Sequence, residues 1–464
     1  MNEVDTDVKM ERGLKNRHIQ LIALGGAIGT GLFYGSSETI KMAGPAIVLS
    51  YLLGGIVTYF TLRALGEMSV DNPVSGSFSY YAYKNWGEFS GFFSGRNYWF
   101  NYIDVSMAEL SVIGIYVNYW FPSIPSYISA LVSLVIFTLI NVTNVKYFGE
   151  FEFWFALIKV LAIILMILFG LFIILFNVSS ANVSSANVSS TDVIGFSNLW
   201  IHGGFFPNGF LPILLSLSIV VFSFGGIELI GITAGEASDP KKSIPKAINQ
   251  VLYRILIFYI AALLIIMSIF PWNLIGGVGS PFVSIFTKLG IPAASSILNM
   301  VVLTACLSTY NSCLYSNGRM LYGLALQGNA PKIFAKLGRS KVPVNGVLFS
   351  SLLTSVTVIL TYLGTKKIFY YLVSVATFSA VINWCLIIIT QIKFRKNLEQ
   401  TYIDKLEFKM PFYPYSNYVC LIFYLVVVVM MGFIEEMRVS LIIGPLWVIL
   451  LYVAYKIKRS QFPA

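Results

Sequence analysis

Four glycines lie within seven residues of the first long apolar stretch: Gly25, Gly26, Gly29 and Gly31. Each glycine weakens a helix by about 1 kcal/mol relative to alanine, so this density disfavours an unbroken helix. Either the helix breaks here and leaves main-chain N–H groups that can bind an anion, or the small residues let another helix approach closely. The crowding of these glycines around Thr30 favours the break.

A second interruption lies in the sixth apolar stretch, from Phe222 to Glu228, with the sequence FSFGGIE. A Gly-Gly pair beside an acidic residue is hard to explain by packing. Two glycine-interrupted segments at corresponding places in two halves of a chain indicate a transporter site built from broken helices. Exposed N–H groups suit an anion and free carbonyls suit a cation, so a zwitterion fits both breaks together.

Ionisable residues within apolar runs are costly in a membrane and usually functional. Lys159 lies in such a run; alternatively, its ammonium reaches the nearby membrane surface, since Glu150 is only nine residues away. Glu228, at the second interruption, is either a gate that responds to protonation or the acceptor of a structural hydrogen bond. Asp104 favours a cationic substrate, such as histidine or lysine, only if it faces the site.

Aromatic side chains near these positions could stack on an aromatic substrate. Tyrosine and tryptophan also gather at membrane interfaces, so position alone does not assign them to a pocket. The candidates are Tyr98, Trp99, Tyr102, Phe222 and Phe224.

The whole chain has the composition of a membrane protein. Of its 464 residues 57% are hydrophobic and 11% are charged, whereas soluble domains carry about 25% charged residues. A spanning helix needs about 20 apolar residues. Runs of that length predict an all-α polytopic protein with about twelve helices at 18–41, 45–68, 89–118, 124–144, 150–176, 208–232, 248–270, 294–325, 344–363, 367–391, 414–433 and 439–456.

Lysine and arginine residues concentrate in alternate connections between these helices, beginning with Lys9, Arg12, Lys15 and Arg17 in the N-terminal tail. The positive-inside rule therefore predicts that both termini are cytoplasmic, which agrees with an even number of helices. The repeat NVSSANVSSANVSS, which begins at Asn177, then forms a polar extracytoplasmic loop. Residues 1–10 are acidic and polar, with neither a basic n-region nor a cleavage site before the first apolar run, so we expect no cleaved signal peptide.

Other chemistry is poorly represented. The chain has two histidines, and its four cysteines form no C-x-x-C pair, so we expect no metal site. It contains neither a G-x-x-x-x-G-K-[ST] phosphate loop nor a G-x-S-x-G elbow. The sequence therefore predicts a protein that is not an enzyme, has no cofactor and does not bind nucleic acid.

Several long motifs resemble a known family: ERGLKNRHIQLIALGGAIGTGLFYGSSETI from Glu11, GEFEFWFALIKV from Gly149, FSFGGIELIGITAGEASDPKKSIPKAINQVLYRILIFYI from Phe222 and YNSCLYSNGRMLYGLALQGNAPK from Tyr310. They resemble bacterial amino acid permeases of the amino acid–polyamine–organocation superfamily. The resemblance is greatest to the branch that contains the aromatic amino acid and phenylalanine permeases.

The resemblance implies a LeuT-type fold, in which two inverted repeats of five helices each have a discontinuous first helix, so that helices 1 and 6 are broken. The chain would then divide into an N-terminal tail (1–17), a first repeat (18–176), an extracytoplasmic loop (177–207), a second repeat (208–391) and helices 11 and 12 with the C-terminal tail (392–464).

The resemblance also implies the residues of the site. Ala27, Ile28, Gly29, Thr30 and Gly31 would bind a substrate carboxylate through N–H groups and the Thr30 hydroxyl. Carbonyls of Ala27 or Ile28, and of Phe222 or Ser223, would take the ammonium, with Phe224, Gly226 and Tyr102 completing the site. In related transporters a lysine at the position of Lys159 replaces a sodium ion, which makes Lys159 our first candidate for the coupling proton, ahead of Glu228 and Glu109.

We therefore expect a proton-coupled symporter of the cytoplasmic membrane that imports phenylalanine, tyrosine or tryptophan by alternating access. Its partners would be the amino acid, the proton and the lipid bilayer. The alternatives are a permease for histidine, threonine, proline or a basic amino acid, and a non-transporting amino acid sensor. The oligomeric state does not follow from the sequence.

Overall fold

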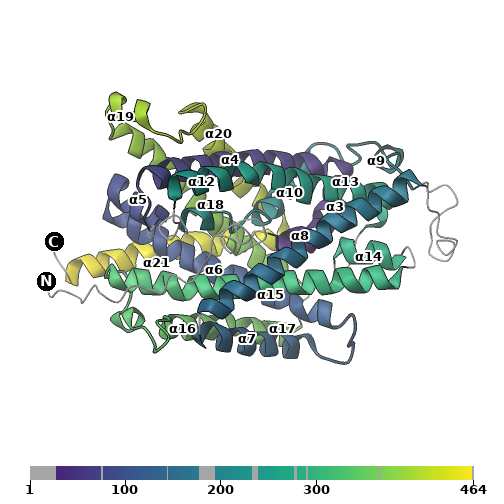
Figure 1. Cartoon of the computed structure of the whole chain (residues 1–464), viewed down its shortest axis with the longest axis horizontal. Helices are drawn as coiled ribbons and strands as arrows, with labels where there is room; N and C mark the ends of the chain where they lie inside the picture. Colours follow the sequence, from purple (N-terminus) through teal and green to yellow (C-terminus); the bar gives the residue numbers. More distant parts are fainter. Residues whose placement is uncertain are drawn as a thin grey trace.

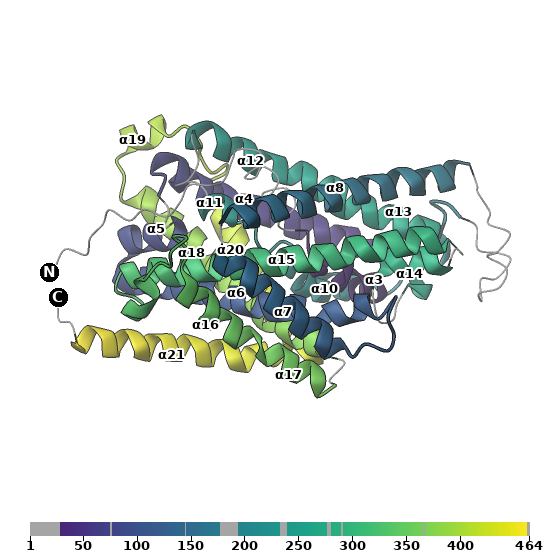
Figure 2. The same ribbon diagram turned by 60° about the horizontal axis from the view of Figure 1, so that its bottom comes forward.

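The computed structural model describes residues 28–74, 77–143, 145–176, 194–232, 239–275, 280–288, 291–364 and 367–461. Every regular element in these ranges is a helix. The long helices run side by side along the long axis of the molecule (Figure 1). A view turned by 60° shows the same bundle, with α21 (Ser440–Gln461) along one side (Figure 2).

Each of the twelve predicted segments corresponds to one or more helices among the described residues, and the first and sixth also contain non-helical interruptions. They correspond to α2 (Thr30–Phe33) with α3 (Gly35–Ala43), α4 (Ile47–Asp71), α6 (Glu88–Val117), α7 (Ser126–Thr143), α8 (Val145–Leu175), α10 (Leu211–Phe222) with α11 (Leu229–Ile232), α12 (Pro240–Arg254) with η4 (Ile255–Ala261) and α13 (Ala262–Ile269), α15 (Pro292–Leu326), α16 (Val344–Thr354) with α17 (Val356–Tyr362), α18 (Ile368–Lys396), α20 (Tyr415–Met431) and α21.

Length and composition allow eight helical stretches among the described residues to cross a membrane, and α10 and α20 are shorter apolar helices. The predicted all-helical, polytopic class is therefore confirmed. The first of the eight joins α3 to α4, from Gly35 to Asp71. Helix α6 is also long, with 30 residues, but it carries the polar side chains of Asn101, Asp104 and Glu109.

Both predicted interruptions lie where helices begin or end. Helix α2 begins only at Thr30, and Gly29 before it is extended, with φ −131° and ψ −157°; Gly25, Gly26 and Ala27 lie outside the described residues. In the sixth segment, α10 ends at Phe222 and α11 begins at Leu229. Gly226 between them has φ +89°, a conformation that only glycine adopts without strain.

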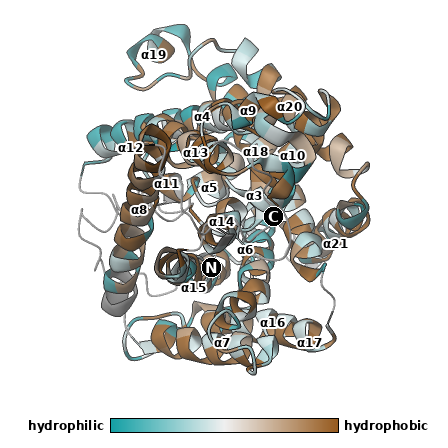
Figure 3. Cartoon of the chain, turned by 90° about the vertical axis from the view of Figure 1, so that its right-hand side faces the viewer, coloured by the Kyte–Doolittle hydropathy of each residue, from teal (hydrophilic) through white to brown (hydrophobic). Residues whose placement is uncertain are grey.

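The centre of the bundle consists of α6 and α15, which pack along each other, with α18 on α6 and α8 on α15. Helix α4 packs against α10, α12 and α18. Helix α8 turns large apolar side chains outward, including Leu161, Leu165, Leu168 and Phe172, and it is brown over most of its length in the end-on view (Figure 3). Such an apolar outer surface suits a lipid environment.

The connections contain short helices that the hydropathy pattern does not predict. They are α5 (Ser77–Trp86), α9 (Asn198–Ile201), α14 (Pro281–Lys288) and α19 (Gln400–Lys405), with the single turns η1 (Gly44–Ala46), η5 (Trp272–Leu274), η6 (Lys332–Ala335) and η7 (Glu435–Met437). Each is too short to span a bilayer, and a search for spans of about 20 apolar residues passes over it.

Candidate functional site

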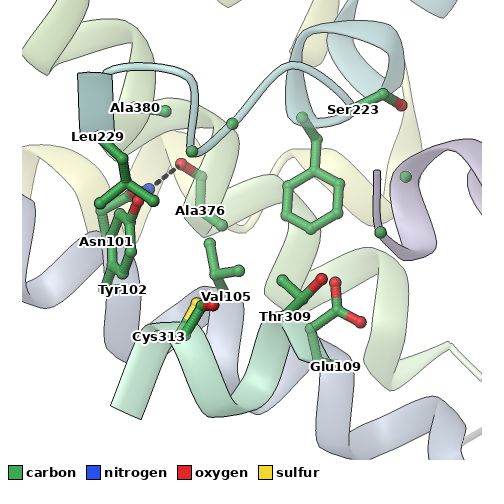
Figure 4. A pocket seen from close by; sticks show the side chains of 16 residues that line it. Asn101, Tyr102, Val105, Glu109, Ser223, Leu229, Thr309, Cys313, Ala376 and Ala380 are labelled. Atoms are coloured by element: carbon green, nitrogen blue, oxygen red, sulfur yellow. Dashed lines mark hydrogen bonds between the residues drawn. The ribbon is translucent and has the colours of Figure 1, made fainter. Parts of the chain in front are cut away.

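A cavity lies at the two helix interruptions. Gly29 and Gly31 contribute from the first, and α6, α15 and α18 close the other sides (Figure 4). The lining residues are Gly29, Gly31, Asn101, Tyr102, Val105, Glu109, Phe222, Ser223, Gly225, Gly226, Leu229, Thr309, Ser312, Cys313, Ala376 and Ala380.

The two interruptions touch each other at Gly31 and Ser223. A Cβ atom added to Gly31 would lie 2.6 Å from the Ser223 Cα, a distance that real Cβ atoms do not reach. A Cβ atom on Gly29 would likewise lie 2.9 Å from Thr309 Oγ1 and 3.0 Å from Glu109 Oε1. Glycine at both positions therefore brings main chain, rather than side chain, to the wall of the cavity.

Glu109 on α6 is bonded to the start of α2. The Thr30 hydroxyl donates to Glu109 Oε1 at 2.8 Å, and the Thr30 main-chain N–H points at the same oxygen at 3.4 Å. Both residues are buried, with exposed fractions of 0% for Thr30 and 1% for Glu109. The donors that the sequence analysis assigns to a bound carboxylate therefore already face a carboxylate of the protein.

At the second interruption one of the predicted carbonyls already accepts a hydrogen bond. Tyr259 Oη donates to the Ser223 main-chain carbonyl at 2.8 Å, which leaves one lone pair of that oxygen for another donor. Among the described residues, Ser223 Oγ and Tyr102 Oη have no hydrogen-bond partner, although both residues line the cavity. Buried polar atoms without a partner indicate a place where a polar ligand or water binds.

Lys159 is completely buried, so its ammonium group does not reach the surface as the alternative interpretation required. Its Nζ donates to Ser308 Oγ at 3.0 Å, and Ser308 Oγ donates to Glu152 Oε1 at 2.8 Å. Glu109 also acts electrostatically on Lys159. Lys159 does not line the cavity but belongs to the layer behind it, between α8 and α15.

Glu228 is also buried, and it does not line the cavity. Trp384 Nε1 donates to its Oε2 at 3.4 Å. Together with Thr58, Thr61 and other residues of α4, Glu228 lines a separate, narrower space. Its surroundings are compatible with both roles that the sequence analysis left open.

Three of the predicted substrate-binding residues, Ile28, Thr30 and Phe224, are buried but do not line the cavity. Phe224 packs on Tyr51 and Tyr259, with ring centroids 6.1 and 5.1 Å away. Ile28 has no exposed surface and belongs to the hydrophobic core. Of the aromatic candidates, Tyr102 and Phe222 line the cavity, whereas Trp99 does not and stacks on Phe349 of α16.

Asp104 does not line the cavity either. It lies three residues beyond Asn101 and seven residues beyond Asn97 on α6, and both asparagines donate to main-chain carbonyls of α18. Residues spaced by three or four along a helix share a face, so Asp104 lies on the α18 side of α6. Asp104 is thus not among the residues that line the cavity, and its effect on substrate selectivity stays a prediction.

Several lining residues went unnoticed in the sequence. Thr309, Ser312 and Cys313 are small or weakly polar residues of α15, and Ala376 and Ala380 are small residues of α18. The signal was present, because positions 309, 312 and 313 share one helix face. The sequence analysis could not tell that this face, among many in an apolar helix, borders a cavity.

No group of three or more histidine, cysteine, aspartate or glutamate residues that could hold a metal ion occurs within the described ranges. The site consists of main-chain atoms, hydroxyl groups, aromatic and aliphatic side chains, the Asn101 amide, the Cys313 thiol and one carboxylate. These groups can bind a small zwitterion with an apolar side chain.

Comparisons with known proteins agree with this arrangement. The family model "Amino acid permease" matches residues 18–464. The chain is 49% identical over 457 residues to the "Aromatic amino acid transport protein AroP" of Escherichia coli K12, covering 98% of this chain and 97% of the relative. It is 48% identical over 452 residues to AroP of Salmonella typhimurium SL1344 (97% and 96%). It is also 47% identical over 447 residues to the "Uncharacterized amino acid permease YtnA" of Bacillus subtilis 168 (96% and 95%). This similarity extends over nearly the whole length of each protein, and the chain is a multi-pass membrane transporter that belongs to the amino acid permease family.

Proposed function

We propose that this protein imports aromatic amino acids, namely phenylalanine, tyrosine and tryptophan, across the cytoplasmic membrane together with protons. The observation that carries the proposal is the 49% identity, over 98% of the chain, to a relative named as an aromatic amino acid transport protein. The lining of the cavity is consistent with such a substrate, because Tyr102 and Phe222 offer aromatic surface while Val105 and Leu229 are apolar.

In this proposal the substrate carboxylate binds at the N-terminal end of α2, at the main-chain N–H groups of Gly29 to Gly31 and the Thr30 hydroxyl. Glu109 now holds Thr30, so the incoming carboxylate must displace the Glu109 carboxylate or bind after it is protonated. The ammonium group binds the carbonyl oxygens of Phe222 and Ser223 at the second interruption. Each of these oxygens accepts one hydrogen bond within the protein and keeps a second lone pair for the substrate. The aromatic ring lies toward Tyr102.

The coupling proton is carried by Lys159, with Glu109 as the residue that links the proton to the substrate. Repulsion from a second carboxylate makes protonation of Glu109 favourable when the substrate binds. Glu109 acts electrostatically on Lys159, so a proton bound at one residue affects the other. In this proposal Glu228 has a structural role: it accepts a hydrogen bond from Trp384 and so helps to hold the second interruption in place.

The orientation follows the distribution of positive charge, with both termini in the cytoplasm and the 177–207 connection outside. Import then carries substrate from the loop side toward the side of the termini. The rocking of two repeats about this site, 18–176 and 208–391, would open it alternately to each side.

The experiment is uptake of labelled phenylalanine by the purified protein in lipid vesicles. We expect accumulation when the vesicle interior is more alkaline than the buffer and only equilibration when the pH gradient is abolished. A panel of unlabelled amino acids then tests the substrate: tyrosine and tryptophan should compete, and histidine and lysine should not. Binding without accumulation would instead indicate a sensor, and competition by histidine or lysine would indicate a different permease.

A further inference from the structure

A buried glutamate that the proposed function leaves without a role ends a short chain of hydrogen bonds. Glu152 has no exposed surface, lies on α8, and accepts a hydrogen bond from Ser308 of α15. Its second oxygen, Oε2, has no hydrogen-bond partner within the part of the chain that the structure describes. A carboxylate in such a position costs free energy in a membrane protein, which points to a function.

The chain has the geometry of a proton relay. Lys159 Nζ lies 3.0 Å from Ser308 Oγ, and Ser308 Oγ lies 2.8 Å from Glu152 Oε1. A serine hydroxyl can accept one hydrogen bond while it donates another. Ser308 does both, and its two partners are the proton donor and the proton acceptor that such a transfer needs.

We propose that Glu152 is a second proton-binding site, which receives the coupling proton from Lys159 through Ser308. This inference rests on the proposed function, because it assumes that Lys159 carries a transported proton. The ammonium of Lys159 gives a proton to Ser308 Oγ, and the hydroxyl gives its own proton to Glu152 Oε1. A charged pair, Lys159 ammonium and Glu152 carboxylate, thereby becomes a neutral amine and a neutral acid.

The transfer leaves the net charge of the buried pair at zero, so the low-dielectric interior does not oppose it as it would oppose an isolated charge. The other titratable groups that act on the pair are Glu109 on α6, Arg254 on α12, and Cys306 and Cys313 on α15. Glu109 is bonded to Thr30 and thus to the proposed substrate site. Displacement of Glu109 by substrate would change the field at Lys159.

The position of Glu152 also gives the relay a direction. Glu152 is seven residues nearer to the start of α8 than Lys159, or about 10 Å along the axis at 1.5 Å per residue. In the proposed orientation the start of α8, at Val145, is at the cytoplasmic end. The proton thus moves from the level of the substrate toward the compartment into which it is released.

The test uses Glu152→Gln, which still accepts a hydrogen bond from Ser308 but cannot take a proton, and Ser308→Ala, which removes the relay. The matched control is Glu150→Gln, at a position two residues before Glu152 on the same helix. Each protein in vesicles is assayed for accumulation driven by a pH gradient, for substrate-driven proton movement with a trapped pH dye, and for exchange of labelled against unlabelled phenylalanine without a gradient.

We expect Glu152→Gln and Ser308→Ala to lower the initial rates of gradient-driven accumulation and proton movement by about a hundredfold or more, the lower end of the range for a lost proton-transfer group. Exchange should be retained, and Glu150→Gln should resemble the unchanged protein. Accumulation at the unchanged level in Glu152→Gln would overturn the relay alone. Loss of exchange in both variants would show a structural role and would also overturn it. If the unchanged protein exchanged phenylalanine but never accumulated it, the proposed coupling itself would fail.

Discussion

At the scale of single residues, the site depends on glycines that allow main chain to approach main chain. Gly31→Ala would place a Cβ atom 2.6 Å from the Ser223 Cα, whereas an added Cβ at Gly323 of α15 would meet nothing within 4 Å. We expect Gly31→Ala to abolish most transport and to lower the free energy of unfolding by about 1–3 kcal/mol, the usual effect of overpacking. Gly323→Ala should transport normally.

Uptake and thermal unfolding in detergent check both variants. If Gly31→Ala transported like Gly323→Ala, the two interruptions would not be in the close contact that defines the site.

Thr30 gives a second residue-scale prediction, because its hydroxyl is the short donor to Glu109, at 2.8 Å. Thr30→Ser keeps that hydroxyl and Thr30→Ala removes it. A hydrogen bond to a charged group contributes about 1.5–3 kcal/mol, so Thr30→Ala should raise the KM for phenylalanine roughly tenfold or more. Thr30→Ser should remain within a few-fold of the unchanged protein. Equal KM values for the two variants would show that the Thr30 hydroxyl does not contribute to substrate binding.

At the scale of elements, the sequence predicts the helices and both interruptions well because the signals are local. Hydropathy over about 20 residues locates a span, and glycine spacing locates the breaks at Thr30 and Phe222. The partners of the polar groups are not local: Thr30 and Glu109 are 79 residues apart. Which face of α6 borders the cavity depends on how four helices pack, and a single sequence contains no direct record of that packing.

The same limit explains why the sequence analysis missed a buried ion pair between elements. Arg395 of α18 donates from Nε and Nη2 to the two carboxylate oxygens of Glu67 on α4, at 2.7 and 2.6 Å. The Met410 main-chain N–H and Gln391 Nε2 bond to the same carboxylate. The network joins α4, α18 and the segment before α20.

Removal of one member of this pair should therefore destabilise the bundle. The Glu67 side chain has no exposed surface and that of Arg395 is 10% exposed, so Arg395→Ala leaves a buried carboxylate without its counter-charge, a change that costs about 3–5 kcal/mol. The control is Glu407→Ala, which removes the partner of Lys241 from a pair whose side chains are 61% and 57% exposed. Such a surface pair contributes at most about 1 kcal/mol.

Thermal unfolding of the two variants in the same detergent compares these effects directly. We expect a large fall in Tm for Arg395→Ala and little change for Glu407→Ala. Similar shifts in both would mean that water reaches the Glu67 carboxylate.

At the scale of the whole molecule, the direction of transport depends on which end of the bundle faces the cytoplasm. The end of α21 carries Lys456, Lys458 and Arg459, and the connection after α18 is also basic. Positive residues are retained on the cytoplasmic side during insertion. The polar repeat that begins at Asn177 follows α8, at the opposite end of that helix from Lys146.

Cysteine labelling in intact cells tests this orientation. The single substitutions Ala186→Cys, in the polar repeat, and Ser460→Cys, near the end of α21, are treated with a maleimide that cannot cross membranes. We expect Ala186→Cys to be labelled in intact cells and Ser460→Cys only after the cells are opened. The unchanged protein gives the labelling background of the four native cysteines, of which Cys306, Cys313 and Cys420 are buried and Cys385 is half-buried. The reverse labelling pattern would show that the molecule has the opposite orientation in the membrane. Glu152 would then lie toward the outside, and the proposed relay would carry protons out of the cell rather than into it.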